Sequence, residues 1–349
     1  MLEPAKARAA AHPDGIVDLS IGTPVDPVPP VIREALAAAS DWPGYPTTAG
    51  TPALRTALAS YVERRCGLAV GVGGVLPTIG SKELVAALPS QLGLGSDDTV
   101  VIPTVCYPTY EVGARLAGAA VVRADSPVAV PASVGNVRLV WVNSPGNPHG
   151  RVLSADELRA WVEWTRAHGA VLASDECYLE LGYDVEPVSA LSVCGPSADG
   201  VLAVHSLSKR SNLAGYRAGF VAGDPAIVGE LLAVRKHSGL MVPGPVQAAM
   251  VAALSDPTHA ARQLEVYARR RSLLRDAVLG AGFTIDHSQA GLYLWATRDE
   301  DCWSTVDWLA ERGILAAPGD FYGPAGSRHV RLALTASDER IAAAVARLA

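Results

Sequence analysis

The sequence has few of the residues and patterns that mark several protein classes. Its five cysteines form no CxxC pair and their number is odd, so a disulfide-stapled secreted domain is not expected. The eight histidines show no HExxH or HxxxH spacing, and no metal site is predicted. We therefore expect a reduced, cytoplasmic chain.

Long hydrophobic runs and blocks of a single charge are absent as well. No uninterrupted apolar run reaches the roughly 18 residues that a membrane helix needs, and the N-terminus lacks the apolar region of a signal peptide. The 29 Lys and Arg residues against 35 Asp and Glu leave a net charge of −6, without a basic block. Membrane and nucleic-acid partners are therefore not expected.

The remaining composition indicates a globular α/β protein. Of the 349 residues, 49% are hydrophobic and 18% are charged, which is enough apolar material for a sizeable core. Between about residues 76 and 222, short β-rich runs alternate with helical stretches, a pattern typical of a mostly parallel sheet with helices on both faces. Strands are expected at 99–102, 120–123, 138–143, 171–173, 201–204 and 219–222, and helices at 107–117 and 155–168.

The segments on either side of this stretch predict a smaller α+β domain. A Pro- and Gly-rich arm precedes helices expected at 31–39 and 52–66. Helices at 225–238, 245–254 and 262–279 and strands at 292–296 and 329–334 are expected after the sheet. We divide the chain into an N-terminal arm with part of the small domain (1–40), a large ligand-binding domain (41–235) and a C-terminal small domain (236–349).

Polar residues follow the predicted strands, at the sheet edge where ligands of such folds bind. Asn147 follows one strand, and Asp175 and Tyr178 follow the next. Gly80 and Ser81 open a helix, whose unpaired N–H groups suit an anion. The strand at 201–204 is followed by Ser206, Ser208, Lys209 and Arg217.

Each of these residues has a simple structural explanation when it is taken alone. Asp175 could cap a helix, Lys209 could be solvated, Ser81 could be an N-cap, and Asn147 could be a turn residue. Taken together, they offer a helix N-terminus, hydroxyls and an arginine for a phosphate, a carboxylate for a protonated ring nitrogen, and an amine for a Schiff base. This set describes a site for pyridoxal 5′-phosphate.

The ordered motifs resemble those of class I and II aminotransferases of fold type I. The lysine signature S-x-S-K-x(5)-G-x-R-x-G lies at 206–219. It is accompanied by N-P-x-G at 147–150, D-E-x-Y at 175–178, Y-P-x-Y at 107–110, G-Y-x(4)-G at 44–50 and a late Arg331. His149 stands where threonine is usual, and Cys177 where an aliphatic residue is common. The resemblance spans essentially the whole chain and implies a pyridoxal-phosphate-dependent aminotransferase.

The resemblance also implies a role for each matching residue. Lys209 would anchor the cofactor and act as general acid and base, and Asp175 would keep the pyridine nitrogen protonated. Asn147 and Tyr178 would hydrogen-bond the phenolic oxygen of the ring, on which Tyr107 would stack. The substrate would be bound by Arg331, through its α-carboxylate, and by Gly22 and Asn147. The phosphate would be held by Gly80, Ser81, Lys82, Ser206, Ser208 and Arg217, together with Tyr45 from the neighbouring copy in a homodimer.

Longer segments, such as LPTIGSKELVAALP, resemble succinyldiaminopimelate transaminases of the actinobacterial type. This resemblance implies amino transfer between glutamate and N-succinyl-2-amino-6-oxopimelate, giving N-succinyl-diaminopimelate and 2-oxoglutarate in lysine and diaminopimelate biosynthesis. Both substrates carry a distal carboxylate, for which Lys82 or the segment Arg235, Lys236 and His237 are candidates. The alternative for that segment is an ordinary exposed helix end.

Other functions on the same scaffold stay open at this point. An aminotransferase of other amino acids or a C–S lyase would use the same lysine, because fold and cofactor do not determine which bond is broken. A ligand-sensing regulator built on an aminotransferase domain is a further alternative, although the sequence shows neither an appended helix-turn-helix nor a basic patch.

Overall fold

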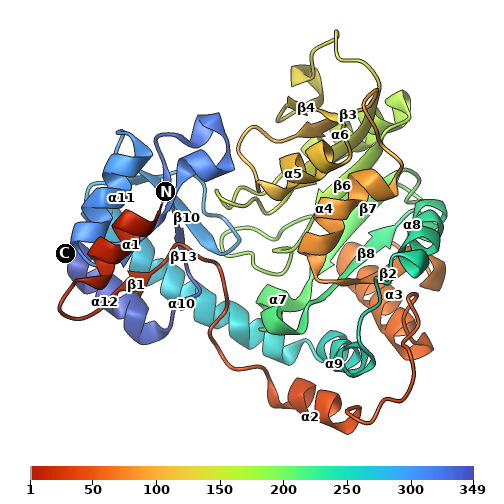
Figure 1. Ribbon diagram of the computed structural model, residues 1–349, viewed down its shortest axis with the longest axis horizontal. Coiled ribbons are helices and arrows are strands. Elements are labelled where there is room, and N and C mark those ends of the chain that lie inside the picture. The colour runs from red at the N-terminus through yellow and green to blue at the C-terminus, as the bar shows by residue number, and fades with distance from the viewer. Residues whose placement is uncertain (1) are drawn as a thin grey trace.

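The computed structural model describes residues 2–349, and a large twisted sheet forms its centre (Figure 1). Within these residues the sheet has seven strands, in the order β2-β8-β7-β6-β5-β3-β4. β8 runs antiparallel to both of its neighbours, whereas the other pairs are parallel. The strands are β2 (Val75–Ile79), β3 (Thr99–Ile102), β4 (Ala120–Arg123), β5 (Val137–Asn143), β6 (Val171–Asp175), β7 (Val201–Ser206) and β8 (Ala218–Gly223).

The edge strand β2 was not expected from the sequence, which placed its residues before the sheet. Pro77 interrupts the short apolar run, and a proline cannot donate a ladder hydrogen bond, so it is confined to positions such as edge strands. β2 occupies such an edge, paired with β8. Because β8 is antiparallel to both β2 and β7, β2 points the same way as β7 and ends at the same edge of the sheet.

Helices cover both faces of the central sheet (Figure 1). One face carries α3 (Pro52–Cys66), α6 (Ala155–His168) and α9 (Gly244–Ser255), and the other carries α4 (Ser81–Gln91), α5 (Thr109–Leu116) and α8 (Pro225–His237). Along β7 the side chains alternate: Val201 and Ala203 join the first core, and Leu202 and Val204 join the second. The sheet is therefore buried on both faces, as the α/β prediction requires.

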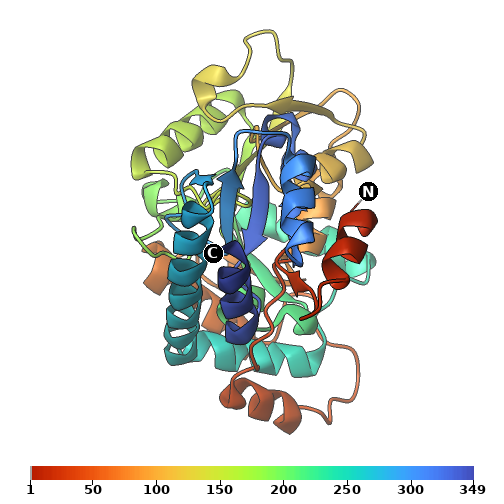
Figure 2. The same ribbon diagram turned by 90° about the vertical axis from the view of Figure 1, so that its left-hand side faces the viewer.

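A second sheet lies beside the first and has four strands within the described chain, in the order β12-β13-β10-β9. Its neighbouring strands are antiparallel, and α10 and α12 pack side by side against it (Figure 2). The N-terminal strand β1 (Val17–Asp18) pairs with β11 (Ile314–Leu315), so the start of the chain joins this second unit. Its other elements are α1 (Glu3–Ala10), β9 (Thr284–Ile285), β10 (Tyr293–Thr297), β12 (Ala317–Pro318), β13 (Val330–Ala333), α10 (Thr258–Gly280), α11 (Cys302–Glu311) and α12 (Asp338–Leu348).

The remaining elements are short. α2 (Pro30–Ala38) packs against α9, and α7 (Leu207–Arg210) follows β7 directly. Short 3-10 turns lie at Val72–Gly74, Pro127–Ala129, Ala190–Val193, Ala214–Tyr216, Gly319–Tyr322 and Pro324–Gly326. The expected domain boundaries, at 40/41 and 235/236, stay a prediction. Across residues 2–349, every helix is too short or too polar to span a bilayer.

Candidate active site

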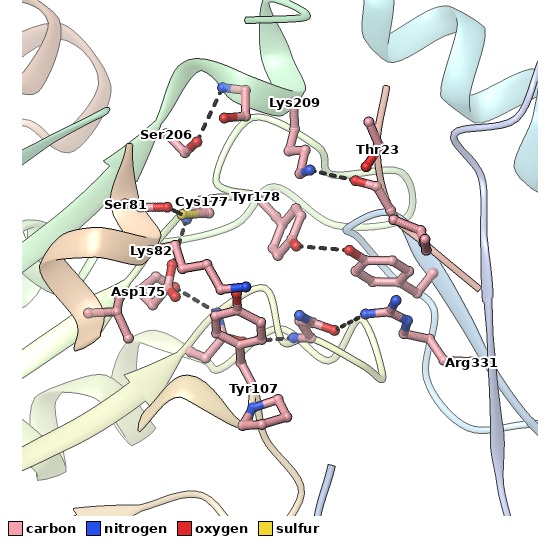
Figure 3. Close-up of a pocket in the computed structure, with 18 of the residues that line it drawn as sticks. Thr23, Ser81, Lys82, Tyr107, Asp175, Cys177, Tyr178, Ser206, Lys209 and Arg331 are labelled. Atoms are coloured by element: carbon pink, nitrogen blue, oxygen red, sulfur yellow. Dashed lines mark hydrogen bonds between the residues drawn. The ribbon is translucent and has the colours of Figure 1, made fainter. Parts of the chain in front are cut away.

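A cavity of about 610 Å³ opens at the edge of the central sheet where β5, β6 and β7 end (Figure 3). The N-terminal arm, the start of α4 and the strands β10 and β13 complete its wall. Most of the site residues expected from the sequence line this cavity, namely Gly22, Ser81, Lys82, Tyr107, Asn147, Asp175, Tyr178, Ser206, Ser208, Lys209, Arg217 and Arg331. Segments far apart in the sequence therefore meet in one place.

Two expected site residues do not line the cavity. Gly80 lies directly behind its wall, at the N-cap of α4. Tyr45 is 93% exposed in the loop that precedes α3. Its expected contact with the phosphate of a neighbouring copy therefore stays a prediction.

Lys209 projects into the cavity from the short helix α7. The Ser206 hydroxyl accepts a hydrogen bond from the Ser208 N–H, which begins this helix immediately after β7. The Lys209 ammonium donates to the carbonyl oxygen of Gly22 in the N-terminal arm. Burial lowers the pKa of Lys209, and the positive charges of Arg331 and Arg217 lower it further. A lysine in this environment is more readily deprotonated, which suits a nucleophile or a base.

Asp175 ends β6 at the floor of the cavity. Its carboxylate accepts hydrogen bonds from the Tyr110 hydroxyl at 2.7 Å and from the Cys177 N–H at 3.2 Å. Burial raises the pKa of Asp175, although these two hydrogen bonds oppose the rise. Tyr110 in turn stacks on Trp141, with ring centroids 4.9 Å apart. A buried carboxylate held in this way can accept a hydrogen bond from a protonated ring nitrogen.

The N-terminus of α4 and the Arg217 guanidinium form a cationic end of the cavity. Gly80 has a positive φ of 70°, and a Cβ atom at this position would lie 2.3 Å from Nη2 of Arg217. The guanidinium therefore lies directly against the positive end of the helix, where two like charges repel unless an anion lies between them. Ser81, Ser206 and Ser208 line the same region. This arrangement fits a phosphate group.

Arg331 on β13 forms the opposite end of the cavity. Its Nη1 donates to Oδ1 of Asn147 at 3.0 Å and its Nη2 donates to the carbonyl oxygen of Ser20 at 2.6 Å. Its Nε is buried without a hydrogen-bond partner among residues 2–349. A buried donor in that state is costly, and a carboxylate ligand would satisfy it.

Several residues in or next to the cavity were missed by sequence reasoning. Tyr110, which does not line the cavity but donates to Asp175, could have been predicted because it is the second tyrosine of Y-P-x-Y. Asn143 ends β5 and orders the loop before Asn147 by accepting a hydrogen bond from its N–H at 2.7 Å. Tyr293 and Tyr322 face Arg331, with its Cζ 4.0 and 5.0 Å from their ring centroids. The signal for Tyr293 was only its place in an apolar strand, which also describes a core residue.

The cationic segment at the end of α8 lies outside the cavity. Arg235 is fully buried and binds both carboxylate oxygens of Glu83, at 2.9 and 2.8 Å. Lys236 and His237 are exposed. The hypothesis that this segment binds a distal carboxylate in the cavity is therefore wrong. Arg235 links α8 to α4 instead.

A separate buried group lies behind the cavity. The ligand atoms of Cys66, Glu176 and His205 all lie within 4.8 Å of one another. Burial lowers the pKa of His205 to about 3, and the nearby charges of Arg65 and Arg210 also lower it. These two positive charges would oppose a bound cation as well. The absence of a metal site stays a prediction.

Comparison with known proteins decides the family. The family model described as aminotransferase class I and II matches residues 14–348. The chain belongs to this family. Family and fold depend on pyridoxal 5′-phosphate, so the cofactor and the fold class expected from the sequence are confirmed.

Three similar proteins illustrate the relationship. The 4-dedimethylamino-4-oxo-anhydrotetracycline transaminase OxyQ of Streptomyces rimosus is 60% identical, over 100% of this chain and 97% of its own length. The probable aminotransferase Rv1178 of Mycobacterium tuberculosis is 62% identical, over 99% of this chain and 83% of its own. Among solved structures, a probable N-succinyldiaminopimelate aminotransferase from Thermus thermophilus has a TM-score of 0.91 and 30% identity, over 99% of this chain and 98% of its own.

Proposed function

We propose that this aminotransferase transfers the amino group of glutamate to N-succinyl-2-amino-6-oxopimelate, giving N-succinyl-diaminopimelate and 2-oxoglutarate. Membership of the family supports the reaction type. The observation that carries the substrate proposal is the side chain of Lys82, which lines the cavity and has no ion-pair partner within the described chain. The Thermus relative, named for this substrate class, adds support.

The residues of the cavity would hold the cofactor in one orientation. Arg217, with Ser81, Ser206 and Ser208 and the first backbone amides of α4, would bind its phosphate. Asp175 would pair with the ring nitrogen, and Tyr107 would cover the ring face. Asn147 and Tyr178 would hydrogen-bond the phenolic oxygen. Bound there, pyridoxal phosphate supplies an electron sink for a bond broken at the α-carbon of the amine.

The chain's own residues would position the substrate and move its proton. The Arg331 guanidinium would bind the α-carboxylate in a bidentate manner and satisfy its unpartnered Nε. Lys209, whose pKa is lowered by burial, would take a proton at Nζ and return it. Gly22 lets the arm pass close to the Tyr293 hydroxyl, from which a Cβ would lie only 2.1 Å away, and its carbonyl oxygen accepts from Lys209.

Lys82 would recognise the distal carboxylate that glutamate and the succinylated acceptor share. Its Nζ lies 5.7 Å from the ring centroid of Tyr107, on the cavity side of α4. Lys82 is exposed, and a substrate bound over it would exclude water and so strengthen its pairing with a carboxylate. Lys82 would then act through its side chain as well as its backbone amide.

The apolar rim of the cavity and the OxyQ relationship favour a second candidate acceptor. Ile21 and Phe321 line the cavity yet are 62% and 38% exposed, so the rim can contact a large apolar substituent. OxyQ is named as the transaminase of a tetracycline precursor. We propose as the alternative a polycyclic ketone of that kind.

Turnover of matched acceptors with the same donor tests the two candidates. With glutamate as donor, we expect the succinylated aminooxopimelate to give a kcat/KM at least about tenfold above that of 4-dedimethylamino-4-oxo-anhydrotetracycline or pyruvate, since one well-placed charged contact contributes about 1.4 kcal/mol or more. Faster turnover of the polycyclic ketone would instead favour the alternative. Elimination of thiol from cystathionine without amino transfer would indicate a C–S lyase.

Two variants test the carboxylate sites separately. Lys82→Met is expected to raise KM for glutamate about tenfold or more but to leave KM for norvaline, which lacks a distal carboxylate, near the wild-type value. Arg331→Ala is expected to weaken the binding of both glutamate and norvaline while the cofactor stays bound. Equal effects of Lys82→Met on both donors would reject the distal-carboxylate role. An unchanged glutamate KM in Arg331→Ala would reject the α-carboxylate role.

The cytoplasmic location and the homodimer remain part of this proposal. The amino donor and keto acceptor follow from the family, whereas neither the compartment nor the assembly does.

A further inference from the structure

Tyr293 lies at the junction of the groups expected to bind substrate and cofactor. It is a buried residue of β10, and its side chain lines the cavity. Its hydroxyl oxygen is 3.3 Å from that of Tyr178, which Figure 3 labels in the cavity. The Arg331 guanidinium lies over the face of its ring, with Cζ 4.0 Å from the centroid. One side chain therefore touches both partners.

The strand pairing places Tyr293 and Arg331 on the same side of the small sheet. Trp295 is directly opposite Arg331, and Tyr293 is two residues from Trp295, so its side chain points to the same face. Gly22 blocks the other direction, because even a Cβ atom at that position would overlap the Tyr293 hydroxyl. The ring thus has little freedom to leave the guanidinium.

The hydroxyl of Tyr293 lies in a strongly positive environment. Burial raises the pKa of this phenol, but the charges of Arg331 and Lys209 oppose burial and the pKa is lowered overall. A phenol with a lowered pKa is a stronger hydrogen-bond donor, so the Tyr293 hydroxyl can donate to the Tyr178 oxygen and leave the single Tyr178 proton for another acceptor. The other titratable groups that interact with Tyr293 are Cys177, Tyr267 and Tyr322.

We propose that Tyr293 is a positioning residue with two separable functions. Its ring supports the Arg331 guanidinium by a cation–π contact and so orients the carboxylate site. Its hydroxyl bonds to Tyr178 and so sets the position of the Tyr178 hydroxyl beside the phenolic oxygen of the bound cofactor. The substrate site and the cofactor ring are thereby linked through one residue. This inference rests on the proposed roles of Arg331 and Tyr178, and is independent of the proposed acceptor.

Tyr293→Phe tests the hydroxyl, because it keeps the ring. A donor on the phenolic oxygen stabilises its anionic form, so the bound cofactor gives up its proton at lower pH when Tyr178 is well placed. In Tyr293→Phe we expect the pH at which the visible absorbance of the holoenzyme changes to rise by about 0.5 to 1 pH unit. The inhibition constant of glutarate, a dicarboxylate without a reacting amine, should stay within about twofold of wild type.

Tyr293→Leu removes both the ring and the hydroxyl, so its difference from Tyr293→Phe measures the effect of the ring. We expect the same rise in the pH of the absorbance change and, in addition, an increase of about tenfold in the glutarate inhibition constant. A glutarate constant in Tyr293→Leu within about twofold of the wild-type value would show that the ring does not support Arg331. An equally weak glutarate constant in both variants would show that the two functions are not separable.

A titration of the cofactor-free protein tests whether the pKa of the Tyr293 hydroxyl is lowered, and it does not need the holoenzyme. Ultraviolet difference titration should reveal an early-ionising tyrosine in the wild type and its loss in Tyr293→Phe. Tyr183→Phe is the matched control, since it removes a buried hydroxyl bonded to the carbonyl oxygen of Gly291 at 2.7 Å and lies outside the cavity. The control should keep the tyrosine that ionises early, and its holoenzyme should change its visible absorbance at the wild-type pH.

Two results would overturn the proposal. The first is a Tyr293→Phe holoenzyme whose visible absorbance changes at the same pH as that of the wild type. The second is an equal shift in Tyr183→Phe, which would mean that any hydroxyl lost near β10 has this effect. Neither readout uses the succinylated acceptor, so failure of that substrate assignment would leave these measurements intact.

Discussion

Among single residues, Lys209 is the most direct test of the site, because it alone offers an amine at the centre of the cavity wall. We expect Lys209→Ala to be purified without the visible absorbance of covalently held cofactor. Its amino transfer should fall by about 10²- to 10⁴-fold or more, the usual contribution of a positioned acid–base group, with the anchor lost in addition. Lys236→Ala, which removes an exposed lysine of α8, is the control and should match the wild type.

His149 is expected to make the stability of the folded chain sensitive to acid. Burial, together with the neighbouring His287 and Arg151, lowers its pKa from 6.5 to about 4, against opposing contributions from Asp125 and Asp286. Its Nδ1 accepts a hydrogen bond from the Arg151 N–H, which requires that nitrogen to be unprotonated. Because the folded pKa is depressed, the unfolded state takes up this proton first. The stabilisation is complete above pH 6.5 and is lost as the pH falls toward 4.

The His149→Thr variant checks this expectation. Melting temperatures measured between pH 7.5 and 4 should fall less steeply with acid in this variant than in the wild type, whatever its stability at neutral pH. His168→Thr, which changes an exposed histidine, should keep the wild-type slope. Parallel curves for the wild type and His149→Thr would contradict the assignment.

Between elements, the Arg235–Glu83 pair joins α8 to α4, the helix whose N-terminus faces the cavity. Arg235 is fully buried, so removing it leaves the partly buried Glu83 carboxylate uncompensated. We expect Arg235→Ala to lower the free energy of unfolding by about 3 kcal/mol or more, measured by denaturant titration. The double variant Glu83→Leu with Arg235→Leu should recover much of that loss. An Arg235→Ala variant as stable as the wild type would show that the pair contributes little.

At the scale of the whole molecule, the proposed homodimer has to be tested by experiment, because the structure describes a single chain. Tyr45 is almost fully exposed and does not line the cavity of its own chain, and we propose that it completes the phosphate site of a second copy. Mixing Tyr45→Ala with Lys209→Ala tests this idea, because each hybrid dimer would contain one site with both residues intact. We expect the mixture to bind cofactor and turn over better than either variant at low cofactor concentration. Activity equal to the average of the two separate variants would reject the shared site.

Local sequence patterns anticipated most of the central sheet and the cofactor side of the cavity. The strands β3, β4, β5, β6 and β7 were expected close to their observed bounds. Polar residues that follow parallel strands must gather at one sheet edge, since those strands end together. Asp175 and Lys209 could therefore be placed near each other before the fold was known. Pro77 hid β2, because a proline is compatible with an edge strand and argues against a central one.

By itself, the sequence determined the sheet, the lysine and the cationic end of the cavity, because each depends on short segments whose local geometry is set by strand ends and helix starts. Only the tertiary structure decided how Arg331, which the resemblance named for the substrate carboxylate, is held at the opposite end of the cavity. There, Arg331 bonds Asn147 and Ser20, which lie 184 and 311 positions away in the chain, and rests on Tyr293. It also decided that Arg235 is buried against Glu83, 152 positions away, rather than free in the cavity. Contacts of such separation arise when helices and strands far apart in the chain pack together, and no local periodicity encodes which side chains then meet.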